Sequence, residues 1–159
     1  MATSTDMLDA IRIEIGDVTP ADGSDPTYSD ATLLDTYFPA GLEMLKGNWP
    51  QLYSVDSTTR VISPDPSDSD YNDERALVVA ASMCVMRAEL TDARRKSIYH
   101  SDPAGATDLR DRADALKQAI ADLVTELNDL RFHKTRRLVE EEVDQGIEIS
   151  RSDIAHQGG

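Results

Sequence analysis

The chain is poor in cysteine and in aromatic residues: Cys84 is its single cysteine, and Phe, Trp and Tyr together make up 5% of its 159 residues. One cysteine excludes an intramolecular disulfide, and the position of Cys84 inside an apolar run indicates a packed thiol of a reducing compartment. Sandwich and barrel folds depend on aromatic and β-branched side chains, so the shortage of aromatics favours helices. The composition therefore predicts a mainly helical protein with an aliphatic core.

Basic residues are also scarce. The chain has 16 Lys and Arg against 30 Asp and Glu, which gives a formal net charge of −14. Binding of DNA through its phosphates needs clustered Lys and Arg, so specific DNA binding is not expected. Such a charge suits a surface that stays near DNA without adhering to it, or one that imitates DNA. Composition does not separate these two.

No apolar run of the sequence is long enough to cross a membrane. A transmembrane helix needs about 20 apolar residues, whereas the longest run, residues 76–90, is interrupted by Arg87 and Glu89. The N-terminal stretch has neither the basic region nor the apolar core of a signal peptide. Because 40% of the residues are hydrophobic, the chain has enough apolar side chains for one core, and its length favours one domain. We expect no membrane partner.

Signatures of catalysis and of metal binding are missing as well. The sequence has no Gly-rich phosphate loop, no G-x-S-x-G, no H-E-x-x-H and no E-x-x-H pairs of a di-iron bundle. Asp68, Asp70 and Asn72 match the first three ligand positions of a calcium loop. However, Asp73 stands where that loop needs glycine and Val79 where it needs glutamate. We therefore expect no enzyme activity, no cofactor and no metal.

What the chain does have is one run, residues 76–90, that is apolar on nearly every side. A helix exposed on one side shows an apolar stripe, whereas a helix enclosed all round loses that asymmetry. The run therefore predicts a buried central helix at about residues 72–97. The face that we expect to meet a second long helix consists of Leu77, Ala81 and Val85.

The second long helix is predicted from residue 106 to about residue 133. Apolar residues recur there alternately four and three residues apart, which is an unbroken heptad seam. A short turn at residues 101–105 makes the two long helices antiparallel neighbours, so we expect the seam to dock on the central helix. The seam consists of Leu109, Ala113, Leu116, Ile120, Leu123, Leu127 and Leu130.

Shorter elements precede the central helix. Apolar residues at helical spacing predict a helix that ends at Gly16, and Ser29 is placed to cap a second one. Pro39 should divide this second helix into two pieces before Gly47. Alternating β-formers then predict a strand or small hairpin within about residues 51–70.

Beyond Lys134 the sequence becomes polar, with isolated apolar residues. We expect a helical domain at residues 1–133 and an extended C-terminal arm at residues 134–159. The alternation of Ile147 and Ile149 with polar neighbours suits a strand added to a partner's sheet edge, and a frayed tail is the alternative. The expected partner-binding residues of the arm are Val143, Ile147, Ile149 and Ile154.

The order of these elements resembles that of the head-tail adaptor (head completion) proteins of tailed bacteriophages. The resemblance covers most of the chain. It rests on a short helix that ends in Ile15-Gly16-Asp17, on two local stretches and on the pair of long helices with a polar arm. The two stretches are Tyr28-Ser-Asp-Ala-Thr-Leu-Leu34 and Thr59-Arg-Val-Ile-Ser-Pro-Asp-Pro66.

This resemblance implies a structural protein of the virion, assembled in the host cytoplasm and located at the head-tail interface. It implies a homo-oligomeric ring, typically of twelve copies, whose arms engage the portal protein and tail-side proteins. DNA would pass through its acidic lumen without specific binding. The alternative is an acidic DNA mimic or regulatory helical bundle that binds a host protein, with Asp122 and Glu126 in place of phosphates. A mimic should stay small in solution, whereas an adaptor should assemble with portal.

Overall fold

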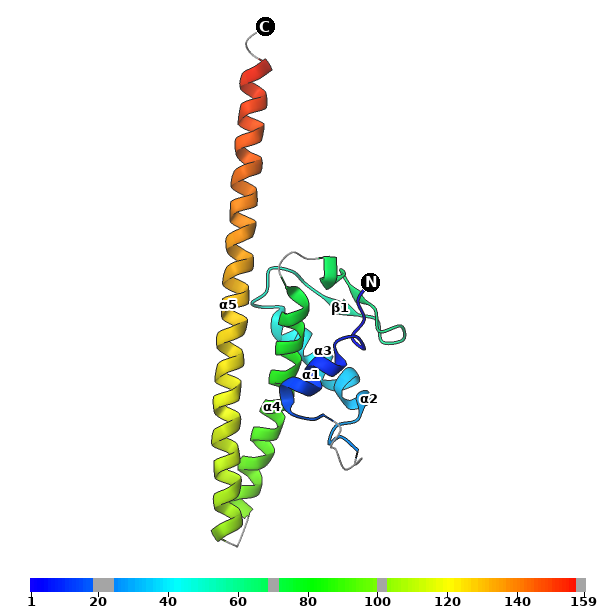
Figure 1. Cartoon of the computed structure of the whole chain (residues 1–159), viewed down its shortest axis with the longest axis vertical. Coiled ribbons are helices and arrows are strands. Elements are labelled where there is room, and N and C mark those ends of the chain that lie inside the picture. Colours follow the sequence, from blue (N-terminus) through cyan, green and yellow to red (C-terminus); the bar gives the residue numbers. More distant parts are fainter. Residues whose placement is uncertain (19–24, 69–71, 100–102, 157–159) are drawn as a thin grey trace.

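The computed structural model describes residues 1–18, 25–68, 72–99 and 103–156; within the helices, the side chains of residues 98–99, 103–107 and 144–156 are not described. Two long helices, α4 (Asp73–Tyr99) and α5 (Pro103–His156), lie side by side and antiparallel, and the shorter elements pack on the other side of α4 (Figure 1). The predicted fold class, a mainly helical protein built on two long antiparallel helices with a small hairpin, is confirmed.

Helix α4 is the centre of the body, because it lies between α5 and the short helices α1 (Leu8–Ile15) and α3 (Phe38–Leu45). Its first apolar turns are buried on every side. The contact with α3 is a contact between backbones: a Cβ atom at Gly41 would lie 2.7 Å from the amide nitrogen of Ala81. Only glycine fits there, so Gly41 sets how closely α3 approaches α4.

Two clusters of apolar side chains lie on opposite sides of α4. We expected Leu77, Ala81 and Val85 to face α5, but these three residues belong to the cluster that contains most of the buried residues of α1 and α3. The cluster that holds Leu123 of α5 contains Val79, Met83 and Met86 instead, and Leu127 and Leu130 of α5 also pack on the larger cluster. The reason is that α4 is apolar all round, so its sequence has no asymmetry that identifies which face meets which neighbour.

The heptad seam of α5 lies against α4. Ala113 and Leu123 are buried, and each is only 5% exposed. The half-buried seam residues Leu116, Ile120 and Leu127 pack on the Val79, Met83 and Met86 cluster, and Leu130 packs on the larger cluster. Leu109, near the start of α5, is half-buried. Seven residues spaced four and three apart thus form one contact surface along α5.

The second predicted helix forms without a break at Pro39. The Ser29 hydroxyl caps α2 (Asp30–Thr32) by accepting a hydrogen bond of 3.1 Å from the backbone. A π-helical turn, η1 (Leu33–Tyr37), then leads directly into α3, and the amide that precedes Pro39 donates to the Leu33 carbonyl five residues earlier. Pro39 has no N–H to donate, and the wider turn before it accommodates the missing hydrogen bond. The expected division of the helix into two pieces therefore does not occur.

The predicted hairpin is confirmed. Strands β1 (Ser54–Val55) and β2 (Ile62–Ser63) pair antiparallel, and a single-turn 3-10 helix, η2 (Pro66–Asp68), follows them. In the turn between the strands, the Asp56 carboxylate accepts the amides of two threonines, and these hydrogen bonds lower the pKa of Asp56. An isolated bridge to Thr3 adds the N-terminus to the second strand's edge.

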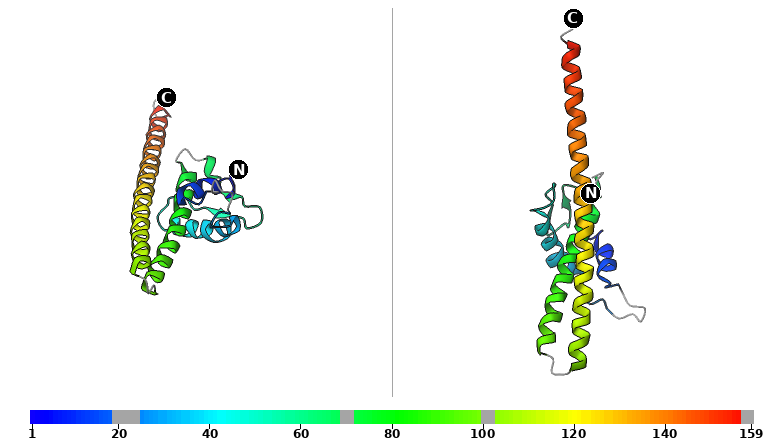
Figure 2. Two further views of the ribbon diagram at one scale, coloured as in Figure 1. Left: turned by 60° about the horizontal axis from the view of Figure 1, so that its bottom comes forward. Right: turned by 90° about the vertical axis from the view of Figure 1, so that its left-hand side faces the viewer.

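The C-terminal region differs from our expectation. We expected an extended arm from residue 134, but α5 continues as one helix to His156 and projects far beyond the body (Figures 1 and 2). The alternation that suggested a strand involves only Ile147 and Ile149, whereas Val139, Val143 and Ile147 repeat every four residues, which suits a helix. Within the described residues, no helix combines the length and the apolar content that crossing a bilayer requires.

Candidate partner-binding surfaces

The point at which α5 leaves the body is marked by a buried charge. Lys134 is 5% exposed, and its ammonium group forms an ion pair with the carboxylate of Asp73, which is fully buried at the start of α4. The Tyr53 hydroxyl donates to the same carboxylate oxygen. The ammonium group also lies 5.4 Å from the ring centroid of Trp49. We call these four residues the anchor.

The anchor moves the end of the body past the expected boundary. We placed that boundary between residues 133 and 134, yet Lys134 contacts Asp73 at the start of α4 and Trp49 in the segment between α3 and β1. Burial, and then the hydrogen bond to Asp73, raises the pKa of Tyr53, so this hydroxyl stays a donor to the carboxylate. A signal for this role was present: Lys134 stands four residues after Leu130, at the next position of the seam.

Beside the anchor and beyond it, α5 carries apolar side chains that are more than half exposed. Phe132 is 63% exposed, Val139 54% and Val143 55%. Their spacings of seven and four residues put them on one face of α5, about half a turn from the seam. We call this face the stripe. Large exposed apolar groups that cluster on one face are typical of a surface that binds a partner.

The other expected arm residues relate to the stripe through their positions alone. Ile147 and Ile154 continue its helical spacing, whereas Ile149 falls on a different face of the helix. The side chains of all three lie outside the described part of the chain. Val143 is therefore the one expected partner-binding residue whose side chain the structure describes, and it lies in the stripe.

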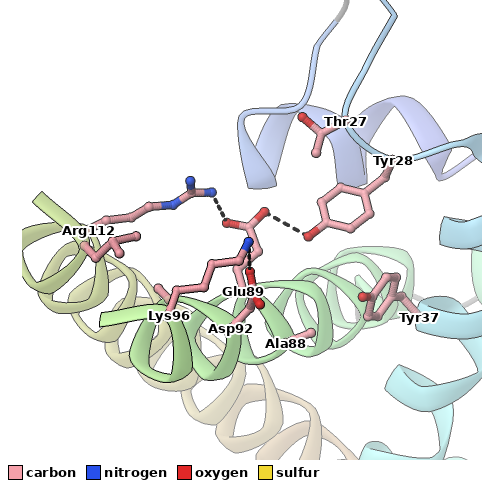
Figure 3. Close-up of a pocket in the computed structure, with 10 residues that line it drawn as sticks. Thr27, Tyr28, Tyr37, Ala88, Glu89, Asp92, Lys96 and Arg112 are labelled. Atoms are coloured by element: carbon pink, nitrogen blue, oxygen red, sulfur yellow. Dashed lines mark hydrogen bonds and ion pairs between the residues drawn. The ribbon is translucent and has the colours of Figure 1, made fainter. Parts of the chain in front are cut away.

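A cavity of about 360 Å³ lies near the base of the helix pair, where Leu109 of the seam forms part of its wall (Figure 3). Three of its polar residues contact one another: the Tyr28 hydroxyl donates to Glu89 over 3.0 Å, and Arg112 pairs with the same carboxylate at 3.0 Å. Burial, and then the charge of Glu89, raises the pKa of Tyr28. The Glu89 carboxylate is thus held between Tyr28 and Arg112.

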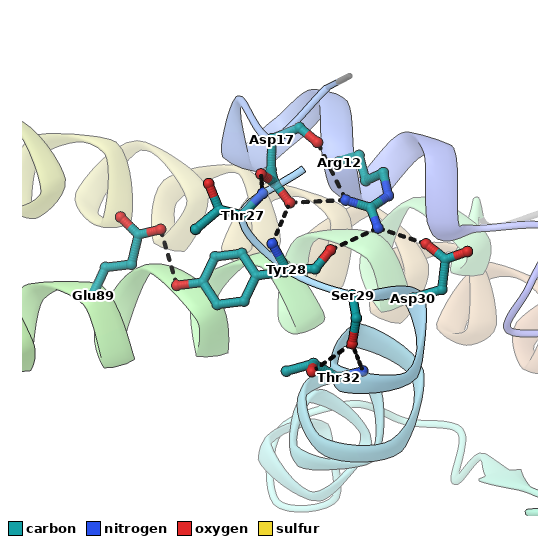
Figure 4. A network of polar contacts seen from close by, with 8 residues as sticks. All are labelled: Arg12, Asp17, Thr27, Tyr28, Ser29, Asp30, Thr32 and Glu89. Atoms are coloured by element: carbon teal, nitrogen blue, oxygen red, sulfur yellow. Dashed lines mark hydrogen bonds and ion pairs between the residues drawn. The ribbon is translucent and has the colours of Figure 1, made fainter. Parts of the chain in front are cut away.

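A buried polar network joins the first helix to the segment that begins the second (Figure 4). The Arg12 guanidinium donates to Asp17 at 2.8 Å, to Asp30 at 2.5 Å and to the Tyr28 carbonyl at 2.8 Å. Asp17 also accepts the backbone amides of Thr27 and Tyr28. The motif that ends in Asp17 and the motif that begins at Tyr28 are therefore one structural unit, and this network explains why both carry these residue types.

Acidic residues that the sequence suggested as ligands have other roles or positions. Asp68 ends η2 and Asn72 has a left-handed backbone (φ 58°), while Asp70 lies outside the described residues. Nearby Asp65, which the sequence did not single out, binds Ser67, the Ala2 amide and the N-terminal ammonium group. In the described part of the chain, no cluster of three or more His, Cys, Asp or Glu residues could hold a metal ion.

The acid pair considered for DNA mimicry is only partly free. Glu126 accepts two hydrogen bonds from Arg75, at 2.6 and 2.8 Å, and Arg75 also pairs with Glu14 at 2.5 Å. The hydrogen bonds that Arg75 donates, to Glu126 first and then to Glu14, raise the pKa of Arg75. Asp122 accepts a hydrogen bond from Gln118. Glu126 is thus part of the joint between α1, α4 and α5 rather than a free substitute for a phosphate.

Comparison of the chain with protein-family models, with curated protein sequences and with solved structures found no match. The surfaces described above are therefore interpreted from their own geometry and chemistry.

Proposed function

We propose that this protein is a structural adaptor of the head-tail connector type. In this proposal, copies of the chain form a ring, twelve in number by the resemblance, that joins a phage portal to tail-side proteins. The body forms the wall of the ring, and the part of α5 beyond the anchor is the docking element. No residue performs chemistry, and the ring is located at the head-tail interface of the virion.

One observation carries this proposal: α5 continues beyond the body as a helix, and its described part there has the exposed apolar residues Val139 and Val143 on one face. Moving three such side chains from full exposure to full burial contributes roughly 5–9 kcal/mol at about 1.5–3 kcal/mol each, and about half of this remains available because each is somewhat more than half exposed. The isolated chain leaves them in water, so this free energy becomes available only when a partner covers the stripe. A protein that presents such a helix is equipped for assembly.

The charge of the chain supports the same proposal. A formal net charge of −14 repels DNA from the surface, which suits a wall along which DNA must slide. The DNA-mimic alternative has no comparable support, because Glu126 is committed to Arg75. An adaptor also needs no catalytic group, and the Glu89 carboxylate in the cavity of Figure 3 is paired with Tyr28 and Arg112.

The experiment is co-assembly with portal rings, observed by electron microscopy and sedimentation. The full chain should add a ring of density to the portal. A chain that ends at Leu138 keeps the anchor and should fold, as circular dichroism would show, but it should not join the portal. A chain that ends at His156 is the matched control and should attach normally. Attachment of the chain ending at Leu138 would contradict the proposed role of the arm.

A further inference from the structure

A cleft of about 200 Å³ opens between α3, α4 and the part of α5 that precedes Lys134. Its apolar lining includes two methionines, whose flexible thioethers adapt to the shape of an occupant. It is small for a cofactor site, since sites for small molecules enclose roughly 300–1,000 Å³. Its size suits one or two aliphatic side chains. The residues used below are Met44, Met83, Val124, Leu127, Arg87, Arg131 and Trp49.

Two arginines of this cleft are without a carboxylate partner, although the chain is rich in acids. Within the described residues, Arg87 donates to the sulfur of Met44 at 3.3 Å, and no ion pair involves Arg131. Arginines elsewhere in the body, such as Arg12 and Arg75, each contact two carboxylates. Guanidinium groups beside an apolar cleft are suited to bind carboxylates that flank an apolar side chain.

The stripe has that combination. Val139 and Val143 are four residues apart on its face, and at helical spacing Glu140 and Glu142 flank this face on either side, while Glu141 lies opposite. Among the described residues, Glu140 pairs with exposed Arg136 of its own helix, a contact of little energetic weight. The charge and the apolar pattern of this segment therefore complement those of the cleft.

We propose that the cleft of one subunit receives the stripe of a second copy of this chain. Val139 and Val143 enter the apolar lining, and Glu140 and Glu142 bind the two arginines of the cleft. Ile147 and Ile154 are left for the portal or tail-side partner. The inference rests on the proposed function, because it assigns the first part of the docking element to the neighbouring subunit of the ring.

A chain cannot fill its own cleft in this way. Arg131 and Val143 belong to one helix and lie about 18 Å apart along its axis, at 1.5 Å per residue. The two surfaces also face directions about a third of a turn apart on α5. Complementary surfaces at different places on one molecule produce a head-to-tail contact, which builds a ring if the rotation between copies closes.

The test mixes two full-length variants. The arm-dead chain carries Val139→Glu and Val143→Glu and keeps its cleft, whereas the cleft-dead chain carries Arg87→Glu and Arg131→Glu and keeps its stripe. Each alone should associate at least about tenfold more weakly than the parent chain, as sedimentation would measure. Their mixture should form a complex of one copy of each that grows no further, because neither end of that pair can extend.

Trp49 reports where the contact forms, because it is the single tryptophan and lines the cleft. Its emission should change when the two variants are mixed. Glu141→Lys and the double change Arg94→Glu with Arg95→Glu are matched controls, since these exposed charges lie outside the stripe and the cleft. Both should associate like the parent chain.

Three results would overturn the inference: self-association of the cleft-dead chain at parental strength, a mixture that stays monomeric, or a complex that leaves Trp49 emission unchanged. The first would mean that stripes pair with stripes. These failures are distinct from failure of the proposed function. If the mixture stays monomeric while the parent chain still joins portal rings, the arm serves the portal alone. If the pair forms but nothing attaches to portal, the ring belongs to another assembly.

Discussion

The inner and outer parts of α5 are one continuous helix in two different environments. The inner part, which ends at Lys134, places its apolar seam on α4. The outer part, from Val139, has its apolar face on the opposite side and in solvent. The outer part needs no nucleus of its own, because it elongates a helix that tertiary contacts have already formed. The comparison teaches that the same pattern of apolar residues serves folding or docking according to what lies against it.

The largest expected effect is on the inner part. Leu123→Asp puts a charge at a buried seam position, where loss of the leucine contacts alone costs about 2–5 kcal/mol. Total stability is commonly about 5–15 kcal/mol, so this variant should not fold at ordinary temperature. Circular dichroism on heating measures it. A variant as helical and as heat-resistant as the parent would mean that the seam does not hold the two long helices together.

The second effect concerns the boundary between the two parts. Lys134→Ala leaves the Asp73 carboxylate buried without its cation, which typically costs about 3–5 kcal/mol. Urea denaturation should show this loss. The double variant Lys134→Met with Asp73→Asn removes both charges and should recover much of the stability. Equal losses in the single and the double variants would show that packing of the lysine stem, rather than its charge, holds α5.

Both effects follow from contacts that sequence analysis located only in part. The seam was predictable because seven apolar positions repeat with one period, and Ser29 because its residue type suits a cap. The face of α4 that contacts α5 was not predictable, because that helix is apolar all round. Lys134 was missed because a lysine at a seam position suggests that the buried part of the helix has ended. Only the tertiary structure shows that the buried Asp73 carboxylate lies opposite its ammonium group.

The outer part was mistaken for an extended arm for a related reason. Its apolar residues are few, so a helical and an alternating pattern both fit segments of it. The decisive factor is continuity with the docked inner part, which lies outside the local sequence. Likewise, the residues around Gly41 in the sequence do not indicate its close contact with α4. A Cβ atom at Gly41 would lie 2.7 Å from the backbone nitrogen of Ala81.

A smaller effect is expected from acid. Hydrogen bonds from Ser67, and then the N-terminal ammonium group, hold the pKa of Asp65 well below its usual range. The stabilisation is therefore present above the unfolded-state pKa of about 4 and is lost as the pH falls through the lower folded-state pKa. Asp65→Asn should be less stable than the parent at neutral pH, and the difference should shrink as the pH falls. Urea midpoints along a pH series measure it, and a constant difference would exclude this role of the charge.

The smallest effect on folding is expected in the outer part. Val143→Asp adds a charge to a side chain that is already 55% exposed, so the melting temperature should change little. Assembly should nevertheless fail, because the stripe then has a charge at its centre. Comparison with Leu123→Asp by the same heating experiment sharpens the contrast between the two parts. A large drop in melting temperature would mean that Val143 is covered within the isolated chain.

The anchor also makes the outer part of α5 a lever. From Leu138 to His156 the helix extends about 27 Å at 1.5 Å per residue. A tilt of about 1° at Lys134, about 33 Å from the tip, therefore displaces the tip by about 0.6 Å. A substitution at the Asp73 and Lys134 pair would shift every tip of a symmetric assembly by the same distance, in directions related by the symmetry, without altering one residue of the tip. The direction in which the arms point, as distinct from how tightly they bind, is thus set inside the body, by two buried charges far from where the arms make contact.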